Sequence, residues 1–483
     1  MTRTHPAGLP TLFFAEMWER FSYYGMRALL VLYLVNSLEF ARADALAVYA
    51  TYTGLVYFTP ILGGYIADRW IGPRRAVFVG GVVMALGHFA MAFPALLYPA
   101  LGLLIVGNGF FKPNISTLVG GLYAPGDTRR DAGFTIFYMG INVGAFLAPL
   151  VCGTLGEKFG WHYGFAAAGV GMALGLFVFG FGQHRLAQSA SPADRNRLTA
   201  RDWGTIAGIS TAAVLLVYAA VTLWPLVHSL WRGLSAFGAG TLALALALAF
   251  LIGPRFISGR GERLAPVERR RVAAILIVAV FVMAFWVGFE QAGGTMNLFA
   301  DTLTDRVMFG WEMPASWFQA INPLLIIALA PVFAWLWPRL DRSRFAPSSI
   351  VKQALGMIIL GLGFVILAIG QQHADTVGKV SPLWLFTAFA FHSVGELLLS
   401  PVGLSMVTKL APARLVSLLM GLWFAAIATA SYLAGILESL LAGSGIPLYW
   451  FLMTVSIGAG VLLLLVSPLL HRLIGDARTQ RDH

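Results

Sequence analysis

Long apolar segments recur along the whole chain, separated by shorter segments that carry charges, prolines and glycines. Most of them hold about 20 residues, the length that an α-helix needs to cross a bilayer. Alternation of apolar and polar residues in blocks of about ten, which is typical of an outer-membrane barrel, is not found. We therefore predict membrane-spanning helices at residues 12–38, 45–67, 75–98, 99–122, 131–156, 163–183, 203–225, 229–253, 271–297, 315–338, 350–371, 382–408, 414–441 and 447–473.

The composition supports this interpretation. Of the 483 residues, 58% are hydrophobic and 11% are charged, and the mean hydropathy is +0.77. Such a chain has more apolar surface than the core of a water-soluble domain needs, so we predict an all-α integral membrane protein with 14 transmembrane helices in a 6+2+6 arrangement. The single cysteine, Cys152, excludes an internal disulfide and leaves no thiolate cluster for a metal.

The distribution of positive charge predicts the orientation. If the N-terminus is cytoplasmic, most of the 33 Lys and Arg residues fall in cytoplasmic segments. This asymmetry predicts cytoplasmic N- and C-termini and a multi-pass protein of the cell membrane, surrounded by lipid. The positively charged cytoplasmic segments also account for the net charge of +11. A basic chain can indicate nucleic-acid binding, but here the membrane orientation explains the charge, so we expect no nucleic-acid partner.

The first predicted helix carries charges where an apolar sequence is expected. Glu16 and Arg20 are four residues apart, Glu19 precedes Arg20, and Tyr23 and Arg27 continue the same face. A charged residue at the centre of a membrane helix costs about 2.5 to 3.5 kcal/mol, so such residues normally pair or face a polar cavity. The charges also interrupt what would be the apolar core of a cleavable signal peptide. We predict a functional site on this face.

A short charged loop follows the second predicted helix, at residues 64–75. It resembles the Asp-Arg loop motif of the major facilitator superfamily, and its charged residues are Asp68, Arg69, Arg74 and Arg75. Such a loop can act as a conformational latch whose ion pairs differ between states, or it can be an ordinary positively charged cytoplasmic loop. A weaker echo at residues 341–344 is expected if the two halves of the chain are parallel repeats.

Five sequence motifs indicate one family within this superfamily. They are EMWERFSYYG at 16–25, GNGFFKPNIS at 107–116, FTIFYMGINVG at 134–144, FWVGFEQ at 285–291 and GELLLSP at 395–401. In this order they resemble the signatures of the proton-coupled oligopeptide transporter family of the major facilitator superfamily, whose bacterial members also carry two extra central helices. The glycines before Lys112 do not form a nucleotide-binding loop, because no strand precedes them and no Gly-Lys-Ser/Thr ending follows.

The resemblance implies a domain plan and a function. It implies a six-helix bundle at residues 1–185, a linker with two additional transmembrane helices at 186–265, and a second six-helix bundle at 266–483. The implied function is proton-coupled symport that imports di- and tripeptides by alternating access, by a functional monomer that needs no cofactor because the proton gradient drives it.

The charges within the predicted spans suggest how a peptide binds. The first half contributes Glu16, Glu19, Arg20, Arg27 and Lys112, formally +1, and the second contributes Glu290 and Glu396, formally −2. A cavity between them would suit a small zwitterion, and a short peptide is one. The resemblance implies that Arg20 and Lys112 bind the peptide carboxylate and that Glu396, Asn142 and Asn322 bind its amino group. The full predicted substrate-binding set is Arg20, Tyr23, Tyr24, Tyr57, Lys112, Asn142, Trp286, Glu290, Asn322, Glu396 and Trp423.

Proton coupling requires carboxylates whose protonation changes between the two access states. We predict that the coupling residues are Glu16, Glu19, Arg20, Arg27 and Glu290, with ion pairs between the halves from Arg27 to Glu290 and from Lys112 to Glu396. The same residues could instead form purely structural ion pairs. Some animal members use a histidine in the second helix, but residues 45–67 contain none. His88 and His392 lie within predicted spans, and we expect them to be hydrogen-bonded supports.

Other functional classes fit the sequence less well. A facilitator for nitrate, another small anion or an amino-acid-like solute would keep the cations of the first half, but it would not need Glu396 to bind an amine. A nontransporting peptide sensor would show a signalling domain or a lost coupling motif. A membrane enzyme would need a nucleophile with a base, a metal cluster or a cofactor loop, and none is recognisable.

Overall fold

A computed structural model describes residues 4–124, 127, 129–189, 192–195, 199–200, 203–204, 207–208, 211–212, 215, 265–341, 347–412 and 415–475. The predicted central helices at 203–225 and 229–253 fall almost entirely outside the described residues. The count of 14 membrane-spanning helices therefore stays a prediction, and so do the domain boundaries near residues 185 and 265.

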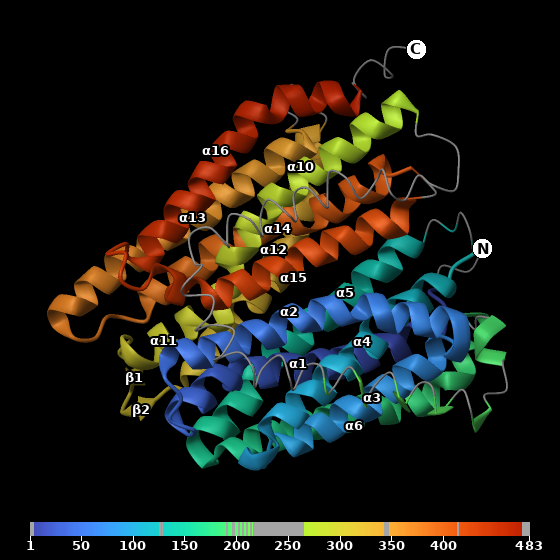
Figure 1. Cartoon of the computed structure of the whole chain (residues 1–483), viewed down its shortest axis with the longest axis horizontal. Helices are drawn as coiled ribbons and strands as arrows, with labels where there is room; N and C mark the ends of the chain where they lie inside the picture. The colour runs from blue at the N-terminus through green and yellow to red at the C-terminus, as the bar shows by residue number, and fades with distance from the viewer. Residues whose placement is uncertain are drawn as a thin grey trace.

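The first half of the chain forms one bundle of helices, shown in blue to green in Figure 1. Helix α1 packs against α5 and α6, and α4 packs between α2 and α3. Two π-helical turns, at Pro149–Gly153 and Leu155–Phe159, extend the line of α5. The helices are α1 (Leu9–Asn36), α2 (Arg42–Ile66), α3 (Pro73–Ala90), α4 (Leu97–Gly121), α5 (Arg130–Ala148) and α6 (Trp161–Gly182).

The second half forms another bundle, coloured yellow-green to red in Figure 1. Helix α13 packs against α14 and α16, and α10 packs against α15 and α16. The helices are α10 (Pro266–Phe289), α11 (Thr295–Thr302), α12 (Ile321–Asp341), α13 (Ser349–Val377), α14 (Leu383–Leu410), α15 (Val416–Leu441) and α16 (Leu448–Ile474), and a hairpin of β1 (Val307–Met308) and β2 (Trp311–Glu312) follows α11.

One predicted helix is interrupted. The expected span at 271–297 lies within one apolar helical stretch, Pro266–Thr302, that is long enough to cross a membrane. This stretch is not one continuous α-helix, because α10 ends at Phe289 and a 3₁₀ turn at Glu290–Gly293 separates it from α11. The adjacent Gly293 and Gly294 explain the break, since glycine gives a helix little support and adopts backbone angles that other residues avoid. The turn places Glu290 at the junction of two helices.

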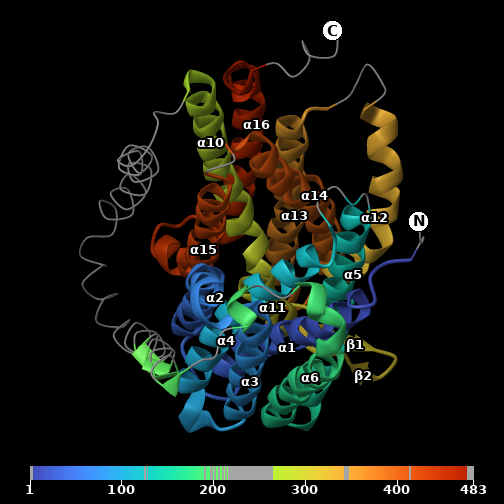
Figure 2. The ribbon, with the colours of Figure 1, turned by 90° about the vertical axis from the view of Figure 1, so that its right-hand side faces the viewer.

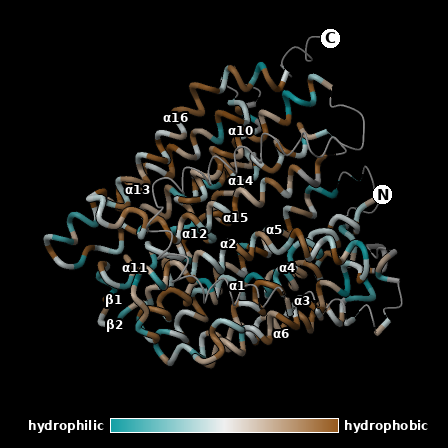
Figure 3. The backbone as a smooth tube through the Cα atoms, viewed as in Figure 1, coloured by the Kyte–Doolittle hydropathy of each residue, from teal (hydrophilic) through white to brown (hydrophobic). Residues whose placement is uncertain are grey.

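Most of the described helices suit a bilayer. Within the described part of the chain, ten helical stretches are long and apolar enough to cross a membrane. Helix α1 is not among them because it carries four charged residues, and α3 is short and begins with two arginines. Apolar residues run along the helices in Figure 3, and hydrophilic ones gather toward their ends. The protein is thus a multi-pass membrane protein.

The two bundles meet along α2 and α15 and along α5 and α12, as the side view in Figure 2 indicates. Polar contacts join them at the end that carries α11 and the hairpin, far from both termini in Figure 1. There the Asn36 amide donates to Asp301 Oδ2 at 2.8 Å, and Arg42 Nε pairs with Glu438 Oε1 at 2.6 Å. We call this the far end of the molecule, and it is the end at which these contacts hold the bundles together.

Buried small residues allow close helix packing within the first bundle. The side chain of Cys152 is fully buried in the π-helical turn that follows α5, where it lies against Gly25 of α1. Gly63 of α2 lies against the backbone of α4, and a Cβ atom at this position would collide with the Gly109 carbonyl. Approach this close requires glycine.

Replacing Gly63 with Leu is therefore expected to destabilise the protein by about 1 to 3 kcal/mol or more, because a packed helix interface cannot accept the added atoms. Gly458→Leu in α16 is the matched control, since a Cβ atom there meets no atom of the described residues within 4 Å. Thermal unfolding in detergent measures both. Equal melting temperatures for the two variants would show that α2 and α4 do not need this close contact.

Candidate functional site

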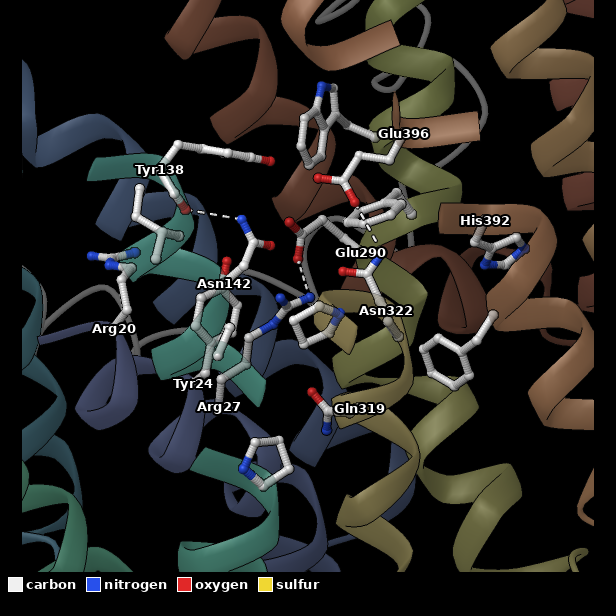
Figure 4. A pocket seen from close by; sticks show the side chains of 18 of the residues that line it. Arg20, Tyr24, Arg27, Tyr138, Asn142, Glu290, Gln319, Asn322, His392 and Glu396 are labelled. Carbon is white, nitrogen blue, oxygen red and sulfur yellow. Dashed lines mark hydrogen bonds and ion pairs between the residues drawn. The ribbon is translucent and has the colours of Figure 1, made fainter. Parts of the chain in front are cut away.

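A cavity of about 220 Å³ lies between the two bundles, and Figure 4 shows it from close by. Helices α1, α2, α4 and α5 line one side, and α10, α12, α14 and the turn around Glu290 line the other. Most of the predicted substrate-binding residues line this cavity, namely Arg20, Tyr24, Tyr57, Lys112, Asn142, Trp286, Glu290, Asn322 and Glu396.

The positive wall of the cavity is an ion cluster between α1 and α4. Both carboxylate oxygens of Glu19 accept hydrogen bonds from Arg20, from Nε and Nη2, at 2.5 Å each. Arg20 Nε also lies 3.5 Å from Glu16 Oε1, and Lys112 Nζ pairs with the same oxygen. Asn108 Nδ2 donates to Glu19 Oε1 at 3.2 Å. The two cations of this wall are thus already neutralised by two buried carboxylates.

This arrangement differs from one predicted ion pair. Lys112 was expected to reach across to Glu396, but it pairs with Glu16 instead. Glu396 accepts a hydrogen bond from Asn322 Nδ2 at 2.9 Å. The physical reason is proximity, because α4 packs against α1, whereas Glu396 lies on the opposite wall of the cavity. In this conformation the predicted Lys112 pair is not formed.

The other predicted pair between the halves is present. Arg27 Nη2 lies 2.8 Å from Glu290 Oε2, and Arg27 Nε donates to the Tyr49 hydroxyl at 2.7 Å. The two charged side chains are only 7% and 2% exposed, so this ion pair is shielded from water. It connects α1 with the turn between α10 and α11, between the cavity and the contacts of the far end.

The negative wall combines a carboxylate with amides. Asn322 donates to Glu396 and also to the Ser393 hydroxyl at 3.1 Å, which fixes the orientation of the Asn322 side chain. From the first bundle, Asn142 reaches the cavity while its Nδ2 donates to the Tyr138 carbonyl at 3.0 Å. Figure 4 shows Arg20 and Glu396 on opposite sides of the cavity, so the site is bipolar.

Two predicted residues do not line the cavity. Tyr23 is buried against Tyr52 of α2, with 6.3 Å between the stacked rings, whereas the neighbouring Tyr24 reaches the cavity. Consecutive helical residues point about 100° apart, and here that offset turns Tyr23 toward α2 and Tyr24 toward the cavity. Trp423 of α15 is buried beside Gly403 of α14. Both residues are therefore packed between helices and do not line the cavity.

Comparison with known proteins decides the family. The model of the POT family matches residues 74–447 of the chain. The chain belongs to the POT family. The transporter YclF of Bacillus subtilis (strain 168) is 40% identical, over 97% of this chain and 95% of its own length. A di-/tripeptide transporter of Lactococcus lactis subsp. cremoris is 35% identical, over 98% and 97% of the two chains.

Solved structures of the POT family share this fold. A crystal structure of a peptide transporter POT in complex with sulfate superposes with a TM-score of 0.81, at 39% identity, covering 98% of this chain and 96% of that one. The agreement extends over both bundles, which confirms the predicted family and the predicted all-helical membrane fold, whereas the count of 14 helices is not tested by it. The family model matches residues 74–447 and so does not include the motif of the first helix. The relatives that align over nearly the whole chain extend the similarity to that part of the sequence.

The predicted latch of this POT-family chain lies in the turn between α2 and α3. The backbone N–H of Arg74 donates to Asp194 Oδ1 at 3.1 Å, and its side chain donates to the Gln183 carbonyl at 3.0 Å. These contacts join the turn to the segment after α6, within the first bundle. The predicted latch residues are Asp68, Arg69, Arg74 and Arg75. Their role as a conformational latch stays a prediction.

Several cavity residues were not predicted from the POT signatures. Tyr138, Gln319 and Phe389 line the cavity, and the Gln319 Nε2 atom has no hydrogen-bond partner within the described part of the chain. His392 also lines it, and its ring lies within hydrogen-bonding reach of the Leu360 backbone. The ring of the buried His88 forms no hydrogen bond to any described residue, so the prediction of a hydrogen-bonded support is wrong for His88. A possible signal for Tyr138 was its place in the motif at 134–144, four residues before Asn142.

Proposed function

We propose that this protein is a proton-coupled symporter that imports di- and tripeptides by alternating access. Membership of the POT family and relatives named as peptide and di-/tripeptide transporters support this function. Transport of a solute needs no catalytic residue or cofactor, and we propose that the proton gradient drives it. We also propose that the functional unit is the monomer in its lipid membrane.

The single observation that supports the peptide substrate best is the bipolar cavity. Arg20 lies on one wall, and Glu396 with Asn322 lies on the other. Lys112 shares the wall of Arg20, because both pair with Glu16. A dipeptide would place its carboxylate at the cations and its ammonium at Glu396. The Gln319 Nε2 atom, which has no partner among the described residues, offers one more donor for a peptide carbonyl. Recognition would then rest on groups that all short peptides share, with Tyr24, Tyr57 and Trp286 beside the variable side chains.

The ion cluster suggests how protons are coupled to the peptide. The positive charges of Arg20 and Lys112 are neutralised by Glu16 and Glu19 in this structure. A peptide carboxylate must therefore compete with these two acids. Protonation of one acid removes its charge and releases a cation for the peptide, so proton and peptide favour each other's binding. This reciprocity is what symport requires.

The contacts between the bundles suggest which state the structure represents. With cytoplasmic termini, as the charge distribution favours, the far end faces outward and is held closed by the Arg27 to Glu290 pair and the contacts beyond it. The bundles would then be in the inward-facing arrangement. Opening outward would require that these pairs separate while the latch turn closes the cytoplasmic side.

Uptake of labelled dialanine into proteoliposomes tests the proposal. We expect accumulation above the outside concentration when an inward proton gradient is imposed, and only equilibration without a gradient. Unlabelled di- and tripeptides should compete, whereas nitrate should not, because only a zwitterion matches both walls. Empty liposomes are the control.

Competition by nitrate but not by peptides would favour the small-anion facilitator and would contradict the peptide proposal. Peptide binding without any uptake, with or without a gradient, would favour the nontransporting sensor.

A further inference from the structure

Helix α4 presents two side-chain donors to the two carboxylates of α1. Asn108 and Lys112 are one helical turn apart on α4, and Glu19 and Glu16 are almost one turn apart on α1. Asn108 Nδ2 donates to Glu19 Oε1 at 3.2 Å, and Lys112 Nζ pairs with Glu16 Oε1. Lys112 has an expected role in peptide binding, but Asn108 has none so far.

Asn108 does not touch the cavity. Its side chain is only 2% exposed, and it is not among the cavity-lining residues, so a bound peptide would not reach it. Its amide instead meets a carboxylate oxygen that also accepts a hydrogen bond from Arg20 Nη2. Glu19 is fully buried, and every hydrogen bond it accepts therefore weighs strongly on whether it is ionised or protonated.

The surroundings of Glu19 contain several other groups that act on its charge. On α1 these are Arg20 and Glu16, on α2 the Tyr52 hydroxyl, and on α4 Lys112. Arg20 and Lys112 favour the ionised carboxylate, and the negative charge of Glu16 opposes it. Asn108 donates to Glu19 through an amide, which does not titrate, so the effect of Asn108 does not depend on its own protonation.

We infer that Asn108 is a positioning residue for proton coupling: its amide holds the Glu19 carboxylate in the fork of Arg20 and sets the pH at which Glu19 exchanges its proton. The inference rests on the proposed symport function. A donor that favours the ionised form makes proton release easier, because the proton must otherwise leave an acid buried among apolar helices. Removing the donor should keep Glu19 protonated to higher pH.

The test is the pH profile of initial dialanine uptake in proteoliposomes. In Asn108→Leu, which keeps the approximate size but loses the donor, we expect the midpoint to move about one pH unit toward higher pH, the effect of one hydrogen bond to a charged group. Asn108→Asp has the shape of Asn but places a second carboxylate beside Glu19, and two adjacent acids hold a proton more firmly. Its midpoint should move further in the same direction.

Asn114→Leu is the matched control. Asn114 is also buried on α4, but its Nδ2 donates to the Phe110 carbonyl at 2.7 Å and hydrogen-bonds to no carboxylate among the described residues. Losing this amide can lower the amount of folded protein, but it should leave the midpoint unchanged. Wild-type midpoints in both Asn108→Leu and Asn108→Asp would show that Asn108 only fills space, and the inference would be wrong.

A second measurement separates this inference from the proposed function. Infrared difference spectroscopy of the full chain in detergent can follow the carboxyl band of Glu19 against pH, identified by its loss in Glu19→Gln. If the wild type shows no gradient-driven uptake, symport fails, and the infrared midpoint alone decides the role of Asn108. An upward shift in Asn108→Leu supports it, and an unchanged midpoint overturns it.

Discussion

Glu290→Gln is expected to abolish accumulation of dialanine against its gradient and to destabilise the protein by about 3 to 5 kcal/mol, because the change leaves the buried Arg27 cation without its partner. Glu290 joins α1 to the turn between α10 and α11, with 2.8 Å between Glu290 Oε2 and Arg27 Nη2. Glutamine cannot take up or release a proton. Protonation at this position can therefore no longer break the contact between the two bundles. Proteoliposome uptake and thermal unfolding measure the two effects.

Two controls isolate the buried charge. The double variant Arg27→Gln with Glu290→Gln removes both charges and should recover most of the lost stability, but not accumulation. Glu438→Gln breaks another ion pair between the bundles, the one with Arg42. The side chains of Arg42 and Glu438 are 43% and 30% exposed. This change should cost less than about 1 kcal/mol. Accumulation at the wild-type level in Glu290→Gln would exclude this carboxylate from coupling.

Glu396→Gln is expected to weaken binding of free dialanine about ten- to a hundredfold, because a charged hydrogen bond contributes roughly 1.5 to 3 kcal/mol and each 1.4 kcal/mol corresponds to about a factor of ten. The Glu396 carboxylate lies at the cavity, accepts a hydrogen bond from Asn322 and faces the wall of Arg20 and Lys112. An ammonium group bound there would lose its counter-ion in the variant. Binding titrations in detergent measure the change.

An N-acetylated dipeptide is the control ligand, since it has no ammonium group. It should bind the wild type poorly and lose much less on mutation. Asn322→Ala leaves the carboxylate in place but removes its donor, so it should weaken free dialanine less than Glu396→Gln does. Equal fractional losses for the free and acetylated peptides would mean that Glu396 supports the wall without binding the amine.

The described helices were predictable because a membrane imposes a simple rule, that about 20 consecutive apolar residues form a span. Helix α1 was recognised although it is charged, because its charges recur on one helical face. The break after Phe289 was missed because Trp286 and Glu290 belong to one continuous motif, and a motif does not state where a helix ends. The pair Gly293 and Gly294 was the available signal.

The residues of the cavity were more predictable than their partners. Charge type alone suggested that Lys112 and Glu396 attract each other, and both do line the cavity. Which acid Lys112 meets depends on the distance between helices, which sequence spacing within one helix cannot give. Asn108 was overlooked for the same reason, because a neutral side chain shows its importance only when Glu19 is seen beside it.

The burial of Cys152 has a practical consequence for following the motion of the two bundles. It is the only cysteine of the chain, and its side chain has no exposed surface. Thiol-reactive probes should therefore not reach it in the folded protein, and an introduced cysteine at an exposed position, such as Phe309 on the hairpin, would be labelled alone. Pairs of such probes on the two bundles could report transport movements in the otherwise natural sequence, without first engineering a thiol-free background.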